Sequence, residues 1–222
     1  MTATLIGATG LIGSYLLPEL LNGDDFDTVR ILIRRPIDLS HPKLEKKIVD
    51  FNDSDSLLVA LSNSDVVFCT VGTTQKKVKG DKQAYRKVDY DIPVKAARFC
   101  KMTGCEKFVL VSSVGADSKS NNFYLNLKGE VEEAIHSVGL NEVHILRPSM
   151  LLGDRKESRI GEKIANTVMK PLSFLIPAKY KPIHAKDVAR KMLAISKNNE
   201  KGGVVYEGSN LLLSSQKDEI NK

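Results

Sequence analysis

The chain has 222 residues, of which 42% are hydrophobic and 27% are charged, and its formal net charge is +6. A chain of this length can bury one well-filled core, and the composition is ordinary for a globular protein. No segment reaches the roughly 18 consecutive apolar residues that a membrane span requires, so we expect no membrane-spanning helix. Lysine and arginine are spread along the whole sequence, which favours solvated surface charge over a nucleic-acid-binding face.

Cysteine usage and the first residues bear on where the protein works. Cys69, Cys100 and Cys105 are an odd number without disulfide or zinc spacing, which fits a reducing compartment. A threonine follows the initial methionine and an apolar run begins almost at once, so the basic segment that opens a signal peptide is lacking. From these two features we expect a cytoplasmic location.

Segments with strand and helix patterns alternate along the chain. Strands are predicted at residues 3–6, 28–33, 47–51, 65–71, 107–111, 142–146 and 204–206. Helices are predicted at residues 11–21, 54–61, 81–102, 123–138 and 185–196, with Pro18 and Pro93 disturbing two of them. This alternation predicts an α/β protein with a doubly wound parallel sheet, a Rossmann fold, covered by helices on both faces.

The last quarter of the chain has a looser pattern. A helix is predicted at 160–169, and prolines bound an apolar patch at 172–176. This patch packs in the core, lines a substrate pocket or forms a patch for a partner or a membrane surface. We expect a single domain over residues 1–208, in which about 150–200 contribute a small substrate lobe, and a polar tail at 209–222. His184 and Asp187 have no third ligand nearby in the sequence, so a structural hydrogen bond is favoured over a metal site, and we predict no metal.

A glycine run lies directly between the first strand pattern and the first helix pattern. In such a turn Gly7 permits the bend, Gly10 lets a pyrophosphate approach the backbone, and Gly13 lets the helix pack on the strand. The positive end of the helix then faces the phosphates. This position predicts a dinucleotide site. The residues of the run expected at the cofactor are Gly7, Thr9, Gly10, Leu11, Ile12 and Gly13.

The end of the second strand pattern distinguishes between the two nicotinamide dinucleotides. A NAD-selective site places an Asp or Glu about 20 residues after the glycines, whereas Arg34 and Arg35 stand at this point. A guanidinium binds the 2′-phosphate that a carboxylate would repel, so the sequence predicts NADP. The ends of neighbouring strands are expected to add the cofactor contacts Asp50, Phe51, Thr70, Val71 and Gly72.

Tyr124 and Lys128 are four residues apart on a predicted helix and therefore share one face. A phenol has an ordinary pKa of about 10 and needs assistance to exchange a proton near neutral pH. A neighbouring ammonium gives that assistance by stabilising the phenolate, and Lys128 can also hold the nicotinamide ribose. Ser112 and Ser113 end the fifth strand pattern, where a hydroxyl can donate a hydrogen bond to a substrate carbonyl.

These motifs together resemble the short-chain dehydrogenase/reductase superfamily, and later segments resemble the Tat-interacting-protein branch of its atypical group. The segments that carry the similarity to this branch are 110–117, 123–125, 128–132 and 146–158, with 183–189 resembling the atypical and extended branches. The resemblance spans residues 1–208 and implies a Rossmann fold that binds NADPH. It implies Tyr124 and Lys128 as the catalytic pair, with Ser113 as the better matching serine and Ser112 as the alternate. The further cofactor contacts that it implies are Ser112, Lys128, Arg147 and Pro148.

Two function hypotheses follow. The first is an NADP-dependent oxidoreductase that transfers a hydride to or from a small carbonyl or alcohol substrate. The second is a catalytically silent NADPH-binding regulator or scaffold, because members of the resembled branch are described as protein-interacting; a protein partner or a homodimer stays open. The chain departs from the family in beginning its glycine motif with Ile6-Gly7 and in having Asp89 where many members have a structural asparagine.

Overall fold

The computed structural model describes residues 1–153, 177–198 and 200–213. Seven parallel strands form one sheet in the order β3-β2-β1-β4-β5-β6-β9. The strand order reverses between β1 and β4, which is the doubly wound arrangement predicted from the sequence. The strands are β1 Thr2–Ile6, β2 Thr28–Ile33, β3 Leu44–Ile48, β4 Val66–Cys69, β5 Lys107–Val111, β6 Glu142–Arg147 and β9 Gly202–Glu207.

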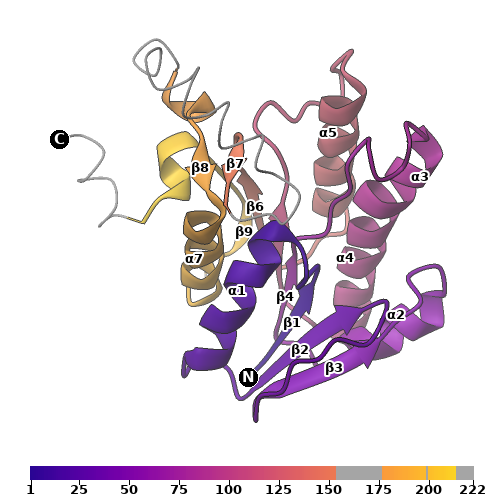
Figure 1. Cartoon of the computed structure of the whole chain (residues 1–222), viewed down its shortest axis with the longest axis vertical. Helices are drawn as coiled ribbons and strands as arrows, with labels where there is room; N and C mark the ends of the chain where they lie inside the picture. The colour runs from indigo at the N-terminus through magenta and orange to yellow at the C-terminus, as the bar shows by residue number, and fades with distance from the viewer. Residues whose placement is uncertain (154–176, 199, 214–222) are drawn as a thin grey trace.

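Helices cover both faces of the sheet (Figure 1). On one face lie α1 (Leu11–Asn22) and α7 (Ala185–Ser196), and on the other lie α2 (Ser54–Leu61), α4 (Ile92–Thr103) and α5 (Phe123–His136). Successive strand residues point to opposite faces, so Leu5 packs in the first core and Ile6 in the second. The central strands are therefore buried on both sides, which explains their nearly continuous apolar sequences.

The predicted helix at 81–102 is divided into three consecutive segments. The short α3 (Lys82–Arg86) passes into a π-helical turn, Lys87–Asp91, before α4 begins at Ile92. Pro93 lies in the first turn of α4 and has no N–H to donate to the carbonyl four residues earlier. A wider turn before this proline accommodates the missing bond, and π-turns of this kind are frequent at functional sites.

The third strand prediction is wrong by three residues. β3 spans Leu44–Ile48 because it pairs in register with β2, placing Leu44 opposite Val29 and Ile48 opposite Ile33. Asp50 and Phe51 therefore lie beyond the end of this edge strand. A second, two-stranded sheet, β7 (Leu151–Leu152) with β8 (Ile183–His184), was not predicted. The segments predicted at 160–169 and 172–176 lie outside the described residues.

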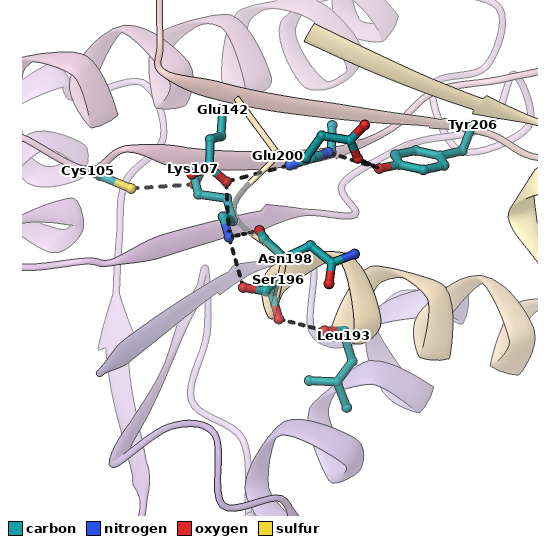
Figure 2. A network of polar contacts seen from close by, with 9 residues as sticks. Cys105, Lys107, Glu142, Leu193, Ser196, Asn198, Glu200 and Tyr206 are labelled. Carbon is teal, nitrogen blue, oxygen red and sulfur yellow. Dashed lines mark hydrogen bonds and ion pairs between the residues drawn. The ribbon is translucent and has the colours of Figure 1, made fainter. Parts of the chain in front are cut away.

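Buried polar groups join α7 and β9 to the starts of β5 and β6 (Figure 2). The Lys107 ammonium donates to the carbonyl oxygens of Ser196 and Asn198, at 2.9 and 2.5 Å, and lies 3.0 Å from Glu142 Oε2. On β6, the fully buried His144 has its Nδ1 3.2 Å from the hydroxyl of Tyr206 on β9. A cation at the C-terminal end of α7 is favourable because carbonyl groups there lack intrahelical partners.

Candidate cofactor and catalytic site

The glycine turn after β1 forms a tight cradle at the start of α1. Gly7 has φ of +94°, a conformation in which other residues are strained, and its carbonyl accepts the N–H of Gly10 at 2.9 Å. A Cβ on Gly13 would lie 2.2 Å from the Gly7 oxygen, so only glycine permits this approach of helix to turn. No side chain in the described part of the chain caps the N-terminus of α1. Its free N–H groups and dipole therefore suit a phosphate.

A cavity of about 610 Å³ adjoins this cradle at the carboxyl ends of β1, β2 and β4. Among the described residues, its charged lining residues are Arg34, Arg35 and Lys77, with no carboxylate beside them. Lys77 comes from the loop after β4. It was not predicted as a site residue. Three cations without a carboxylate favour a ligand with several negative charges.

A second cavity, of about 450 Å³, continues from the first and shares Gly10 and residues 70–73 with it. Tyr124 and Lys128 reach it from α5, and Ser112 reaches it from the end of β5. The start of α5 is fixed by Asn122, whose side chain accepts the N–H groups of Tyr124 and Leu125. The two cavities thus join the phosphate cradle to the predicted catalytic side chains.

Most of the predicted site residues line this groove. The first cavity is lined by Gly7, Thr9, Gly10, Arg34, Arg35, Phe51, Thr70, Val71 and Gly72. The second cavity adds Leu11, Ile12, Ser112, Tyr124 and Lys128. Asp50 lines a neighbouring cavity that shares Arg34 and Phe51 with the first. Ser113, Arg147 and Pro148 line none of these three cavities.

The Lys128 ammonium is buried in an ion pair. Its Nζ lies 3.0 Å from Asp89 Oδ1 and 5.9 Å from the centre of the Tyr124 ring. Burial acts to lower the pKa of Lys128, but the neighbouring Asp89 and Tyr124 outweigh it and raise that pKa above its ordinary value. Lys128 is therefore held in its charged form beside the phenol. Asp89 is a site residue that the sequence had marked only as a departure from the family pattern.

Ser112 is bound to a second buried carboxylate. Its hydroxyl donates to Glu132 on α5, and Glu132 also accepts from the Arg147 guanidinium, whose Nη2 lies 2.5 Å from Oε2. Arg147 is thus engaged within the protein. Because the Ser112 proton is directed to Glu132, its oxygen can offer only lone pairs to the cavity. Ser113 is less firmly held, with its hydroxyl 3.4 Å from the carbonyl oxygen of Val114.

Curated relatives match most of the chain. Protein HTATIP2 from Rattus norvegicus is 37% identical over 164 residues, which are 72% of this chain and 67% of that protein. A protein of Candida albicans named FMP52, mitochondrial, is 34% identical over 196 residues, which are 86% of this chain and 85% of the relative.

The prediction of a cytoplasmic location is wrong. Four fungal relatives that are 31–35% identical to this chain are all named mitochondrial. The prediction rested on unpaired cysteines and on the first few residues. All three cysteines are indeed buried and free, but free thiols do not distinguish one reducing compartment from another. Among the described residues, no helix is both long and apolar enough to cross a membrane.

Solved structures share the fold at low sequence identity. MoeE5 in complex with UDP-glucuronic acid and NAD has a TM-score of 0.74 at 20% identity, with 93% of this chain and 75% of that chain covered. DesIV from Streptomyces venezuelae, a dTDP-glucose 4,6-dehydratase double mutant with NAD bound, has a TM-score of 0.73 at 17% identity, covering 93% and 74%. A family model described as NAD(P)H-binding matches residues 7–199. Taken with the relatives, this match shows that the chain belongs to the NAD(P)H-binding family of atypical short-chain dehydrogenases/reductases, in the branch of HTATIP2.

Proposed function

We propose that the protein is an NADP-dependent oxidoreductase that acts on a small carbonyl or alcohol substrate. The observation that carries this proposal is the charge pattern of the groove. In the part of the chain that the structure describes, its cradle end is lined by three cations and by no carboxylate, and its other end has Tyr124 beside Lys128. This arrangement suits a dinucleotide with an extra phosphate at one end and proton transfer at the other.

Each part of the cofactor would have a protein partner in the groove. The N–H groups at the start of α1 would bind the pyrophosphate, and Arg34 and Arg35, with Lys77 beside them, would bind the 2′-phosphate. Lys128 would hold the nicotinamide ribose. The nicotinamide supplies or accepts the hydride, which is chemistry that no side chain can perform.

The side chains at the catalytic end of the groove transfer the proton and orient the substrate. The Tyr124 phenol donates a proton to the substrate oxygen during reduction and removes it during oxidation. The charged Lys128 lies beside this phenol, with its Nζ 5.9 Å from the ring centre. Ser113 donates a hydrogen bond to the carbonyl oxygen. Ser112 can only accept a hydrogen bond, from a donor such as a substrate hydroxyl, because its own proton is directed to Glu132.

The same groove also favours a second candidate, a regulator or scaffold that binds NADPH without turnover. The Ser112 proton is directed to Glu132, so this hydroxyl, which lines the second cavity, cannot donate to a substrate carbonyl. Tight NADPH binding without turnover of any carbonyl would favour this candidate.

Cofactor preference tests the NADP assignment. We expect the wild type to bind NADPH more tightly than NADH, and Arg34→Ala to narrow the difference by about tenfold or more, because a charge-assisted hydrogen bond to phosphate is lost. Titration calorimetry with each dinucleotide measures both affinities. Arg98→Ala, an exposed position on α4, is the matched control and should leave the preference unchanged. Equal affinities of the wild type for the two cofactors would contradict the assignment.

A further inference from the structure

The carboxylate of Asp89 is buried between the cofactor loop and α5. The residue is 2% exposed, and its two oxygens have different partners. Oδ1 lies 3.0 Å from Lys128 Nζ, and Oδ2 accepts the backbone N–H of Thr73 at 2.8 Å. Asp89, Thr73 and Lys128 all line the second cavity. One side chain therefore contacts both the loop after β4 and the catalytic lysine.

The surrounding structure holds Asp89 in this position. The residue lies within the π-helical turn that precedes Pro93, so its place depends on the local widening of the helix. The Tyr85 hydroxyl, one helical turn earlier, donates to the Thr73 carbonyl oxygen at 3.2 Å. Both the backbone N–H and the backbone C=O of Thr73 are thus bound, and the loop that lines both cavities is fixed to α3 and to the π-turn that follows it.

We propose that Asp89 is a positioning residue for the cofactor: it keeps Lys128 charged and in place, and it couples that lysine to the loop at Thr73. The proposal rests on the proposed role of Lys128 in holding the nicotinamide ribose. An asparagine could accept the Thr73 N–H equally well, but it could not neutralise a buried ammonium. The contact with Thr73 alone therefore does not require a carboxylate, whereas the contact with Lys128 does.

Of the described groups around Lys128, Asp89 is the one that can supply a negative charge to compensate the ammonium. Among the described residues, Lys128 is faced by Asp89 from the π-turn, by Tyr124 from its own helix and by Cys69 from β4. Burial raises the pKa of Cys69 to about 12, so its thiol stays neutral. Burial likewise raises the pKa of Tyr85, next to Asp89 and Tyr124. Without Asp89, burial would favour loss of the Lys128 proton.

The pH dependence of NADPH binding tests the proposal without any need for turnover. We expect the wild type to keep its affinity as the pH is raised from neutral into the alkaline range, because Asp89 favours the charged form of Lys128. Asp89→Asn should bind NADPH about tenfold more weakly near neutral pH and should lose further affinity at a lower pH than the wild type does, because the ammonium has lost its neighbouring carboxylate. Asp91→Asn, at the end of the same π-turn, is the matched control and should follow the wild type. An Asp89→Asn profile that matches the wild type would overturn the proposal.

A double-mutant cycle separates this role from a purely structural one. Removing one partner of a buried ion pair can prevent folding, whereas removing both often does not, so Asp89→Asn is also combined with Lys128→Met. We expect the double variant to melt at a higher temperature than Asp89→Asn and to bind NADPH as Lys128→Met does, because Asp89 acts through Lys128. Additive losses of affinity would contradict the coupling. A wild type that binds NADH as tightly as NADPH would contradict the proposed NADP function, but the cycle could then be measured with either dinucleotide.

Discussion

Ser112 and Ser113 are neighbours in sequence but differ in what their hydroxyls can do. The Ser112 hydroxyl donates to the buried Glu132, whereas Ser113 has only a long contact to a backbone oxygen. We expect Ser113→Ala to lower kcat by about 10²-fold with little effect on melting, because it removes a donor to the developing negative charge.

Ser112→Ala should act mainly on stability. It leaves the buried Glu132 with one hydrogen-bond donor fewer, and hydrogen bonds to charged groups contribute about 1.5–3 kcal/mol each. Thermal melts and steady-state kinetics on both variants distinguish the two serines. Loss of turnover in Ser112→Ala, with normal turnover in Ser113→Ala, would reverse the assignment.

Among single residues, the sequence predicts those whose place in the site depends on short-range spacing. Tyr124 and Lys128 face one cavity because four residues make about one helical turn, and the strand-end position of Arg34 brought it to the cradle. Lys77 and Glu132 were not predicted as site residues, because each meets its partners only through tertiary packing. Asp89 was visible as an unusual residue, but its ion pair with Lys128 depends on how the π-turn packs against α5.

Among the elements, α5 depends on close approach of the loop that follows β5. A Cβ built on Gly129 would lie 2.0 Å from the Ser118 nitrogen and 2.3 Å from the Asp117 carbonyl carbon. We expect Gly129→Ala to destabilise the fold by about 3 kcal/mol, since backbone cannot yield as a flexible side chain can.

Gly139→Ala is the comparison for that substitution. Gly139 follows the end of α5 with φ of +72°, and no atom of the described residues lies within 4 Å of a Cβ placed there, so the cost should be about 1 kcal/mol of backbone strain. Urea unfolding of both variants measures the difference. Equal destabilisation by the two substitutions would contradict the claim that the close backbone contact at Gly129 determines the cost.

The elements that sequence patterns predicted well are those buried on one or both faces. β3 was misplaced because it is an edge strand with exposed Lys46 and Lys47, so its hydrophobic pattern is weak. β7 and β8 have two residues each, too few for any period to register. The π-turn has no short-range signature beyond Pro93, which also fits an ordinary helix start.

Across the whole molecule, stability should depend on pH through His144. Burial lowers the pKa of this imidazole below its ordinary value of 6.5. Glu142 and Glu200 act to raise it, and Lys107 adds to the lowering. The unfolded chain then binds the proton more readily than the folded chain, so stability is complete above pH 6.5 and declines as the pH falls below it.

Urea unfolding at neutral and at mildly acidic pH measures this effect. We expect His144→Phe to be less stable than the wild type at neutral pH, because the contact with Tyr206 is lost, but to lose less stability on acidification. His136→Gln, at the exposed C-terminal end of α5, should keep the wild-type pH dependence. If His144→Phe lost more stability on acidification than the wild type, the assigned direction of the His144 pKa shift would be wrong.

The central claim for the molecule is that one groove binds NADPH and uses Tyr124 to transfer a proton. The most direct measurement is the rate of NADPH oxidation with a panel of small carbonyl compounds, for the wild type, Tyr124→Phe and the control Tyr90→Phe. We predict turnover by the wild type and the control, and a loss of about 10²–10⁴-fold in kcat for Tyr124→Phe with NADPH affinity retained. Undiminished turnover in Tyr124→Phe, or NADPH binding without turnover of any carbonyl in the wild type, would contradict it.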